Sequence, residues 1–171
     1  ALRLVGSEMC IRDSYLNLGR VNCINIDPNN PNIMYVGAPA GGIWKSTDAG
    51  VTYVPLTDNL PQIGVSGIAI DPNNSNIIYI ATGDDDAGDS YSVGIWKSIN
   101  GGASWVPTGL NPSNSPNRTS EIYINPNNSN MLWVATSSGV YKTSNAGNNW
   151  TLTQSGNFRD LKVKPLSLIH I

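Results

Sequence analysis

The sequence of 171 residues predicts an all-β protein. Its apolar residues gather in short β-branched runs, of which 77–81 is typical, and no stretch shows the 3.6-residue apolar period of an amphipathic helix. Two kinds of turn pattern separate these runs, and each pattern occurs three times. Runs of this length between regularly spaced turns indicate antiparallel strands.

The first pattern is an eight-residue turn at 46–53, 98–105 and 143–150. Each copy has a hydroxyl residue, an Asp or Asn two positions later, then a Gly and an aromatic residue: Ser46, Asp48, Gly50, Tyr53, Ser98, Asn100, Gly102, Trp105, Thr143, Asn145, Gly147 and Trp150. We expect the Asp or Asn side chain to accept bonds from backbone N–H groups one to three residues on. The glycine then takes a positive φ, and the aromatic residue opens the next strand and packs over the turn.

The second pattern is an Asp/Asn-Pro-Asn-Asn turn at 27–32, 71–76 and 125–130. One unit therefore reads strand, Pro-Asn turn, strand, loop, strand, eight-residue turn, strand. Four short antiparallel strands in about 45–50 residues make the blade of a β-propeller. The predicted fold is an incomplete β-propeller of about three four-stranded blades.

The blades are expected at 15–56, 65–110 and 120–155, and a fourth begins at 157–165. Three and a fraction blades do not close a ring, so the segment 15–165 is expected to be a propeller fragment whose partners include the remaining blades of a parent chain. The segments 1–14 and 166–171 break the repeat and resemble translated sequencing-adapter sequence. In that interpretation Cys10 and the only histidine, His170, are not native; a Cys10–Cys23 pair says little about compartment.

Composition excludes some classes of function. A net charge of −2 with 13% charged residues gives no basic footprint for nucleic acid. No apolar run reaches the roughly 18 residues of a membrane span. Abundant Asn, Ser and Gly fit an extracellular or cell-surface bacterial protein.

The repeat spacing locates two insertions. Asp27 and Asp71 are 44 residues apart, but Asp71 and Asn125 are 54 apart. The extra residues fall in 83–93 and 111–120. In a four-stranded meander both segments lie at the face opposite the two repeated turns, together with Arg20. Loops on a rigid scaffold tend to carry function, so we expect a carbohydrate or protein ligand on this face.

The insertion at 83–93 holds four carboxylates: Asp84, Asp85, Asp86 and Asp89. Carboxylates this close together repel one another unless a cation balances their charge, and calcium takes six to eight oxygen ligands. Asp84, Asp86 and Asp89 are therefore candidate calcium ligands, against the alternative of a solvated acidic loop. No other cofactor is expected.

Three further residues are candidate ligand contacts. Tyr91 either stacks on a sugar ring or covers the blade edge, and Arg20 and Arg118 either face a ligand or are solvated strand-end charges. The tryptophans are expected to pack between strands and blades, because four of the five recur at repeat positions: Trp44 with Trp96, Trp105 with Trp150.

The eight-residue turns resemble the Asp-box, or bacterial neuraminidase repeat. Together with the preceding 42–46 and 94–98 runs they are similar to sortilin-like and xyloglucanase-like propellers, especially secreted Bacteroidetes proteins with a type IX secretion sorting domain. The resemblance implies export. The xyloglucanase-like family works with carboxylates in a cleft between two propellers, and no position here is assigned to them.

Three functional hypotheses follow. The main one is a recognition or scaffold module of a secreted or cell-surface protein. The alternative is part of a xyloglucanase-like glycoside hydrolase acting on β-glucans, for which the four aspartates at 84–89 are weak acid–base candidates. The second alternative is a sortilin-like peptide-binding receptor.

Overall fold

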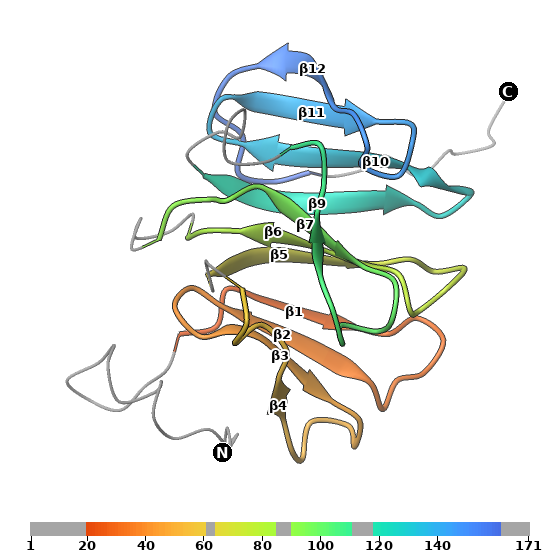
Figure 1. Ribbon diagram of the computed structural model, residues 1–171. Coiled ribbons are helices and arrows are strands. Elements are labelled where there is room, and N and C mark those ends of the chain that lie inside the picture. Colours follow the sequence, from red (N-terminus) through yellow and green to blue (C-terminus); the bar gives the residue numbers. More distant parts are fainter. Residues whose placement is uncertain (1–19, 61–63, 85–89, 111–117, 162–171) are drawn as a thin grey trace, which may run out of the picture.

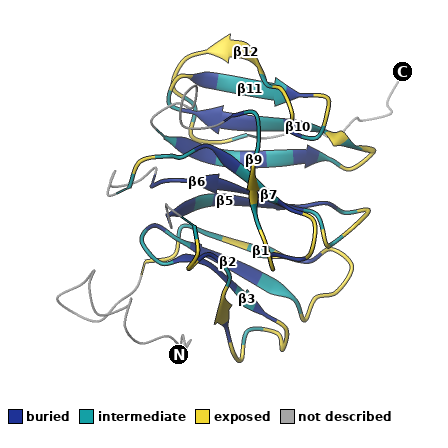
Figure 2. Ribbon diagram, in the orientation of Figure 1, coloured by how far each residue is buried: buried dark blue, intermediate teal, exposed yellow. Residues whose placement is uncertain are grey.

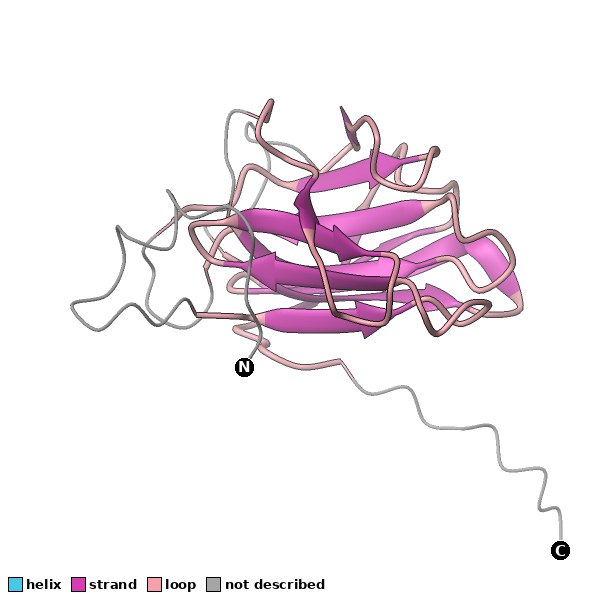
Figure 3. Ribbon diagram, turned by 90° about the horizontal axis from the view of Figure 1, so that it is seen from below, coloured by secondary structure: helices cyan, strands magenta, loops and turns pink. Residues whose placement is uncertain are grey.

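The computed structural model describes residues 20–60, 64–84, 90–110 and 118–161. These residues form three four-stranded antiparallel sheets, and each sheet is a simple meander in chain order. The sheets stack face to face (Figure 1). Figure 3 shows only strands and loops in the described part of the chain, so the predicted all-β class and the blade architecture are confirmed.

The strand bounds follow the repeat. Blade 1 contains β1 (Cys23–Ile26), β2 (Met34–Ala38), β3 (Gly42–Ser46) and β4 (Val54–Pro55). Blade 2 contains β5 (Val65–Ile70), β6 (Ile78–Thr82), β7 (Ile95–Ser98) and β8 (Val106–Pro107). Blade 3 contains β9 (Thr119–Asn125), β10 (Asn128–Thr136), β11 (Gly139–Thr143) and β12 (Thr151–Ser155). Within 20–60, 64–84, 90–110 and 118–161, no helix is long and apolar enough to cross a membrane.

The hydrophobic core lies between the blades. One cluster joins Tyr35 and Ile43 of blade 1 to isoleucines of β5 and β6, and a second joins Tyr79 and Ile95 of blade 2 to aliphatic residues of β9 and β10. Both sides of blade 2 are covered. Its central strand β6 is accordingly buried along its whole length, as a strand between two packed faces should be.

The eight-residue turns close as the pattern predicts. Gly50, Gly102 and Gly147 have φ values of 88°, 91° and 89°, and in each copy the glycine N–H donates to the hydroxyl oxygen four residues earlier. The positive φ of the residue before each glycine was not foreseen: it is 58° at Ala49, 66° at Gly101 and 56° at Ala146. The three turns therefore share two successive left-handed residues.

The reach of the Asp or Asn side chain exceeds the prediction by one residue. Asp48 accepts from Val51, three residues on, at 3.0 Å, as predicted, and also from Thr52, four residues on, at 2.8 Å. Asn100 accepts from the N–H four residues on, at 2.9 Å, and Asn145 does the same.

The tryptophans pack against the sheets, as their recurrence predicts. Trp44 is buried beside Val36 and Tyr53. Trp105 and Trp150, at the ends of the second and third eight-residue turns, donate their indole N–H to the preceding blade region, at Leu56 O (3.1 Å) and Thr108 Oγ1 (3.3 Å). These aromatic residues therefore join neighbouring blades.

Candidate functional site at the loop end

The three sheets have two distinct ends. The end that carries both repeated turns is called here the turn end. The opposite end, where β2 meets β3, β6 meets β7 and one blade passes to the next, is called the loop end (Figure 1). The loop end holds the predicted ligand face, since Arg20, Asp84, Ser90 and Tyr91 belong to segments that leave the strands there.

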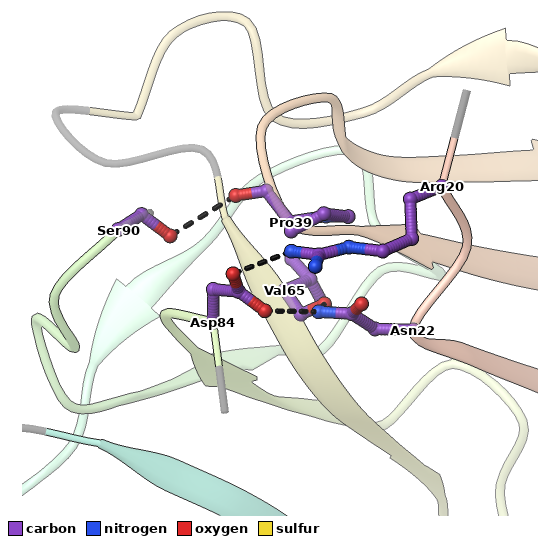
Figure 4. Close-up of polar contacts among 6 residues, drawn as sticks. All are labelled: Arg20, Asn22, Pro39, Val65, Asp84 and Ser90. Atoms are coloured by element: carbon purple, nitrogen blue, oxygen red, sulfur yellow. Dashed lines mark hydrogen bonds and ion pairs between the residues drawn. The ribbon is translucent and has the colours of Figure 1, made fainter. Parts of the chain in front are cut away.

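An ion pair joins blades 1 and 2 at the loop end. The Asp84 carboxylate, whose side chain is 0% exposed, pairs with the Arg20 guanidinium, whose side chain is 37% exposed. Asn22 Nδ2 also donates to Asp84 Oδ1 at 3.3 Å. Figure 4 shows Arg20 and Asn22 converging on Asp84 from the strand-entry segment of blade 1. The pair fixes the start of the 83–93 insertion against the neighbouring blade.

The backbone around Asp84 is held equally closely. Asp84 N–H donates to Ser90 O at 2.9 Å, so the two ends of the insertion meet. Ser90 Oγ in turn donates to Pro39 O of blade 1 at 3.0 Å (Figure 4). A Cβ added to Gly64 would lie 2.2 Å from Ser90 Oγ and 2.5 Å from Pro39 O, so only glycine allows this close approach.

Of the other predicted site residues, some lie within the described ranges and some lie outside them. Tyr91 is 74% exposed beside this network. Arg118 is half-buried at the start of blade 3, and its carbonyl accepts a bond from Ser137 N–H at 3.1 Å. Asp85, Asp86 and Asp89 lie outside the described residues, so the calcium prediction stays a prediction. The described ranges contain no group of three or more His, Cys, Asp or Glu placed to hold a metal ion.

Sequence reasoning placed Arg20 and Asp84 on one face but not in contact, and it missed Asn22 and Ser90. Asn22 Oδ1 is buried and accepts no hydrogen bond within the described part of the chain. The surface of the site is therefore formed by the partly exposed Arg20, which is paired with Asp84, and by the exposed ring of Tyr91. Ligand sites combine aromatic side chains with a few placed polar groups.

Cys23 is a free thiol on β1. Burial raises its pKa to about 12, so the neutral thiol prevails at physiological pH. A neutral buried thiol is a poor nucleophile, which leaves Cys23 a packing residue. The other cysteine of the sequence, Cys10, lies outside the described residues.

No family model matches the chain. A curated xyloglucanase from Hypocrea jecorina (strain QM6a) is 30% identical over 142 residues, which are 81% of this chain and 14% of the xyloglucanase. The chain therefore spans about one seventh of that relative's length. This match and the structural neighbours support a glycoside hydrolase-like propeller fragment.

Solved structures show the same architecture. An ancestral GH74 enzyme is 29% identical, with a TM-score of 0.65 over 77% of this chain and 18% of the enzyme. YCF48 bound to D1 peptide is 18% identical, with a TM-score of 0.63 over 86% of this chain and 46% of YCF48. The second likeness shows the propeller fold alone.

Proposed function

We propose that this chain is part of a xyloglucanase-like glycoside hydrolase and that its loop end binds a β-glucan. The observation that carries the proposal is the 30% identity to a xyloglucanase over 142 residues, together with a GH74 neighbour at 29% identity. The match covers 81% of this chain but 14% of the xyloglucanase, so most of such an enzyme lies outside the matched length.

The loop end has surface chemistry suited to a polysaccharide. Tyr91 projects an exposed ring, and the apolar faces of sugars pack on aromatic rings while their hydroxyls bind polar groups. Arg20, whose side chain is 37% exposed, lies at the same end of the sheets. A β-glucan chain lying across the loop end would meet both kinds of group.

The carboxylates take different roles in this proposal. Glycoside hydrolysis needs two carboxyl groups roughly 5–10 Å apart. Asp84 is buried and paired with Arg20, so it positions the loop rather than reacting. One of Asp85, Asp86 and Asp89 supplies one reacting carboxyl, and a second propeller of the intact protein supplies the other.

Two further parts of the proposal concern the turns and the location of the protein. The eight-residue turns act as Asp-boxes. The protein works outside the cell, where the polymer is found.

A second candidate function is a recognition or scaffold module without catalysis. One specific observation favours it: Asp84, the single carboxylate of the 84–89 cluster that the structure describes, is held by an arginine as a structural group. In that case the loop end binds a carbohydrate or protein ligand and no bond is cleaved.

The test is hydrolysis of xyloglucan by the full-length protein that contains this chain, with Asp85→Asn, Asp86→Asn and Asp89→Asn made singly. Loss of at least about 100-fold in kcat is expected for one variant, as for a general acid or base. Asp48→Asn is the matched control, because the other two turns already carry Asn, and it should keep full activity. A folded parent that does not cleave xyloglucan would contradict the proposal and leave the scaffold function.

A further inference from the structure

The outer edge of each blade is formed by its fourth strand, β4, β8 or β12. All three strands are exposed along their whole length, and Figure 2 shows this most clearly for β12. β4 and β8 have two residues each, whereas β12 has five. An edge strand presents unpaired backbone groups with which another strand can pair. Blade 3 therefore has the longest outer edge of the three described blades.

A proline closes the outer edge of blades 1 and 2. In blade 1, Leu56 N–H donates to Ile43 O of β3 at 2.9 Å, towards the sheet. Because successive residues of a strand direct their backbone groups to alternate sides, the nitrogen of Pro55 faces outward. Pro107 has the equivalent place in blade 2. Proline has no N–H, so neither edge offers a donor at this position.

Blade 3 carries Leu152 where the other two blades carry proline. Leu152 pairs with Tyr141 of β11 in the same register as Pro55 with Trp44 of β3. Its N–H therefore faces outward, and the residue is 46% exposed. Among the described outer edges, that of blade 3 alone keeps a backbone donor at this position.

The only irregularity of β12 is a β-bulge at Thr153, between the pairs made by Leu152 and Gln154. The Thr153 hydroxyl donates to Val140 O of β11 at 2.8 Å, so the bulge is held within blade 3. A bulge bends an edge strand and shortens the stretch along which another strand can pair. It removes no backbone donor, so pairing remains open to a short segment around Leu152.

The composition of β12 suits pairing with a copy of itself. The strand Thr151–Ser155 contains no charged residue. Antiparallel pairing about a two-fold axis brings a strand against its own sequence, where like charges would repel and threonines form favourable pairs. The other outer edges of a second copy carry proline, and its inner first strands are already linked to one another, as by Asn25 Nδ2 and Ile68 O at 2.9 Å.

We propose that the outer edge of blade 3 binds the same edge of a second copy of this chain. β12 lies antiparallel to β12 of the second copy, and each Leu152 N–H donates to a backbone carbonyl of the facing strand. The two four-stranded sheets then form one continuous sheet. This inference goes beyond the proposed function and does not rest on it.

The test compares Leu152→Pro with Leu152→Ala by sedimentation equilibrium of this chain. Proline already occupies this position in blades 1 and 2, so Leu152→Pro is expected to keep the fold. We expect its self-association to be at least about 10-fold weaker than that of the wild type, because it loses the donor and its ring blocks the facing strand. Leu152→Ala keeps the N–H and should lose less than about 3-fold.

A second pair of variants leaves the backbone unchanged. Gln154 is exposed on the same strand, and Gln154→Lys and Gln154→Glu each place like charges close together across the paired strands. Each variant alone should associate more weakly than the wild type, and an equal mixture of the two should associate more tightly than either alone. Added salt should reduce this difference.

Three results would overturn the proposal. One is a wild-type chain that stays monomeric at about 1 mM, where even weak specific pairing is populated. Another is equal association of Leu152→Pro and Leu152→Ala, which would place the contact on a different surface. The third is a Gln154→Lys and Gln154→Glu mixture that associates no more tightly than its components. Circular dichroism and thermal unfolding first establish that each variant is folded.

Discussion

The turn end and the loop end are built in opposite ways. At the turn end, the same hydroxyl–glycine bond forms in all three blades and the same serine–aspartate bond forms at both described blade interfaces. At the loop end, the Arg20–Asp84 pair and the Ser90–Pro39 bond each occur once. Repeated contacts define the scaffold, and contacts that occur once mark where this chain differs from a generic propeller.

The largest expected effect is at the loop end. Arg20→Ala leaves the buried Asp84 carboxylate with weaker partners, which should lower the free energy of unfolding by about 2–3 kcal/mol in urea titrations. Arg20→Ala combined with Asp84→Asn should recover part of this loss, because a neutral amide costs less to bury than an unpaired charge. If Arg20→Ala lowers the free energy of unfolding by less than Ser129→Ala does, the Arg20–Asp84 ion pair does not have this structural role.

At the turn end, Ser129→Ala removes the hydroxyl donor to Asp71, which is 2% exposed. We expect the free energy of unfolding to fall by about 1–2 kcal/mol, since the buried Asp71 Oδ1 loses one of its two donors and keeps only Asn73 N–H. Ser75→Ala should have a similar effect at the other interface. Clearly unequal losses would show that the two interfaces are not energetically equivalent.

A smaller loss of stability is expected when a Pro-Asn turn loses the side-chain amide that bonds it to the next blade. Asn73→Ala breaks two bonds to blade 3 and should cost about 0.5–1.5 kcal/mol of unfolding free energy. Asn127→Ala, at the equivalent position on the outward side, is the matched control and should change stability by less than about 0.5 kcal/mol. Equal losses for the two variants would mean that the interblade bonds add nothing.

The smallest effect concerns pH. Hydrogen bonds from the Thr52 hydroxyl and N–H, and from Ser46, lower the pKa of Asp48 to about 2. Because the folded pKa lies below the unfolded value of about 4, the stabilisation is present above pH 4 and is lost as pH falls towards 2. Asp48→Asn should flatten the pH dependence of Tm in this window. An unchanged pH profile would contradict the prediction.

Much of the turn end was predictable from sequence because its determinants are local. A hydroxyl, an Asp or Asn and a glycine within five residues specify the turn, and the repeat spacing places the insertions opposite the turns. The partner of Ser75 was missed because Asp27 lies 48 residues earlier. Aligning the three Pro-Asn turns places Ser75 and Ser129 at the same position, where blade 1 has Pro31. That recurrence of serine is a sequence signal for a shared structural role.

The loop end was predicted only in outline. Its location followed from the meander, but the contact between Arg20 and Asp84 spans 64 residues and occurs in one blade pair. A contact without repetition leaves no periodic pattern, so composition indicated an acidic loop open to calcium rather than a carboxylate paired with arginine. The xyloglucanase resemblance likewise rested on scaffold turns, which carry no information on the reacting groups.

The most direct test of the account is amide hydrogen exchange of this chain with and without a xyloglucan oligosaccharide. Tyr91→Ala is compared with Val51→Ala, because both side chains are 74% exposed and Val51 lies at the turn end. If the loop end binds the oligosaccharide, we expect added protection around residues 20–22 and 90–94 that Tyr91→Ala removes and Val51→Ala keeps. Protection at 46–53 and 98–105 instead, or no protection at millimolar ligand, would contradict it.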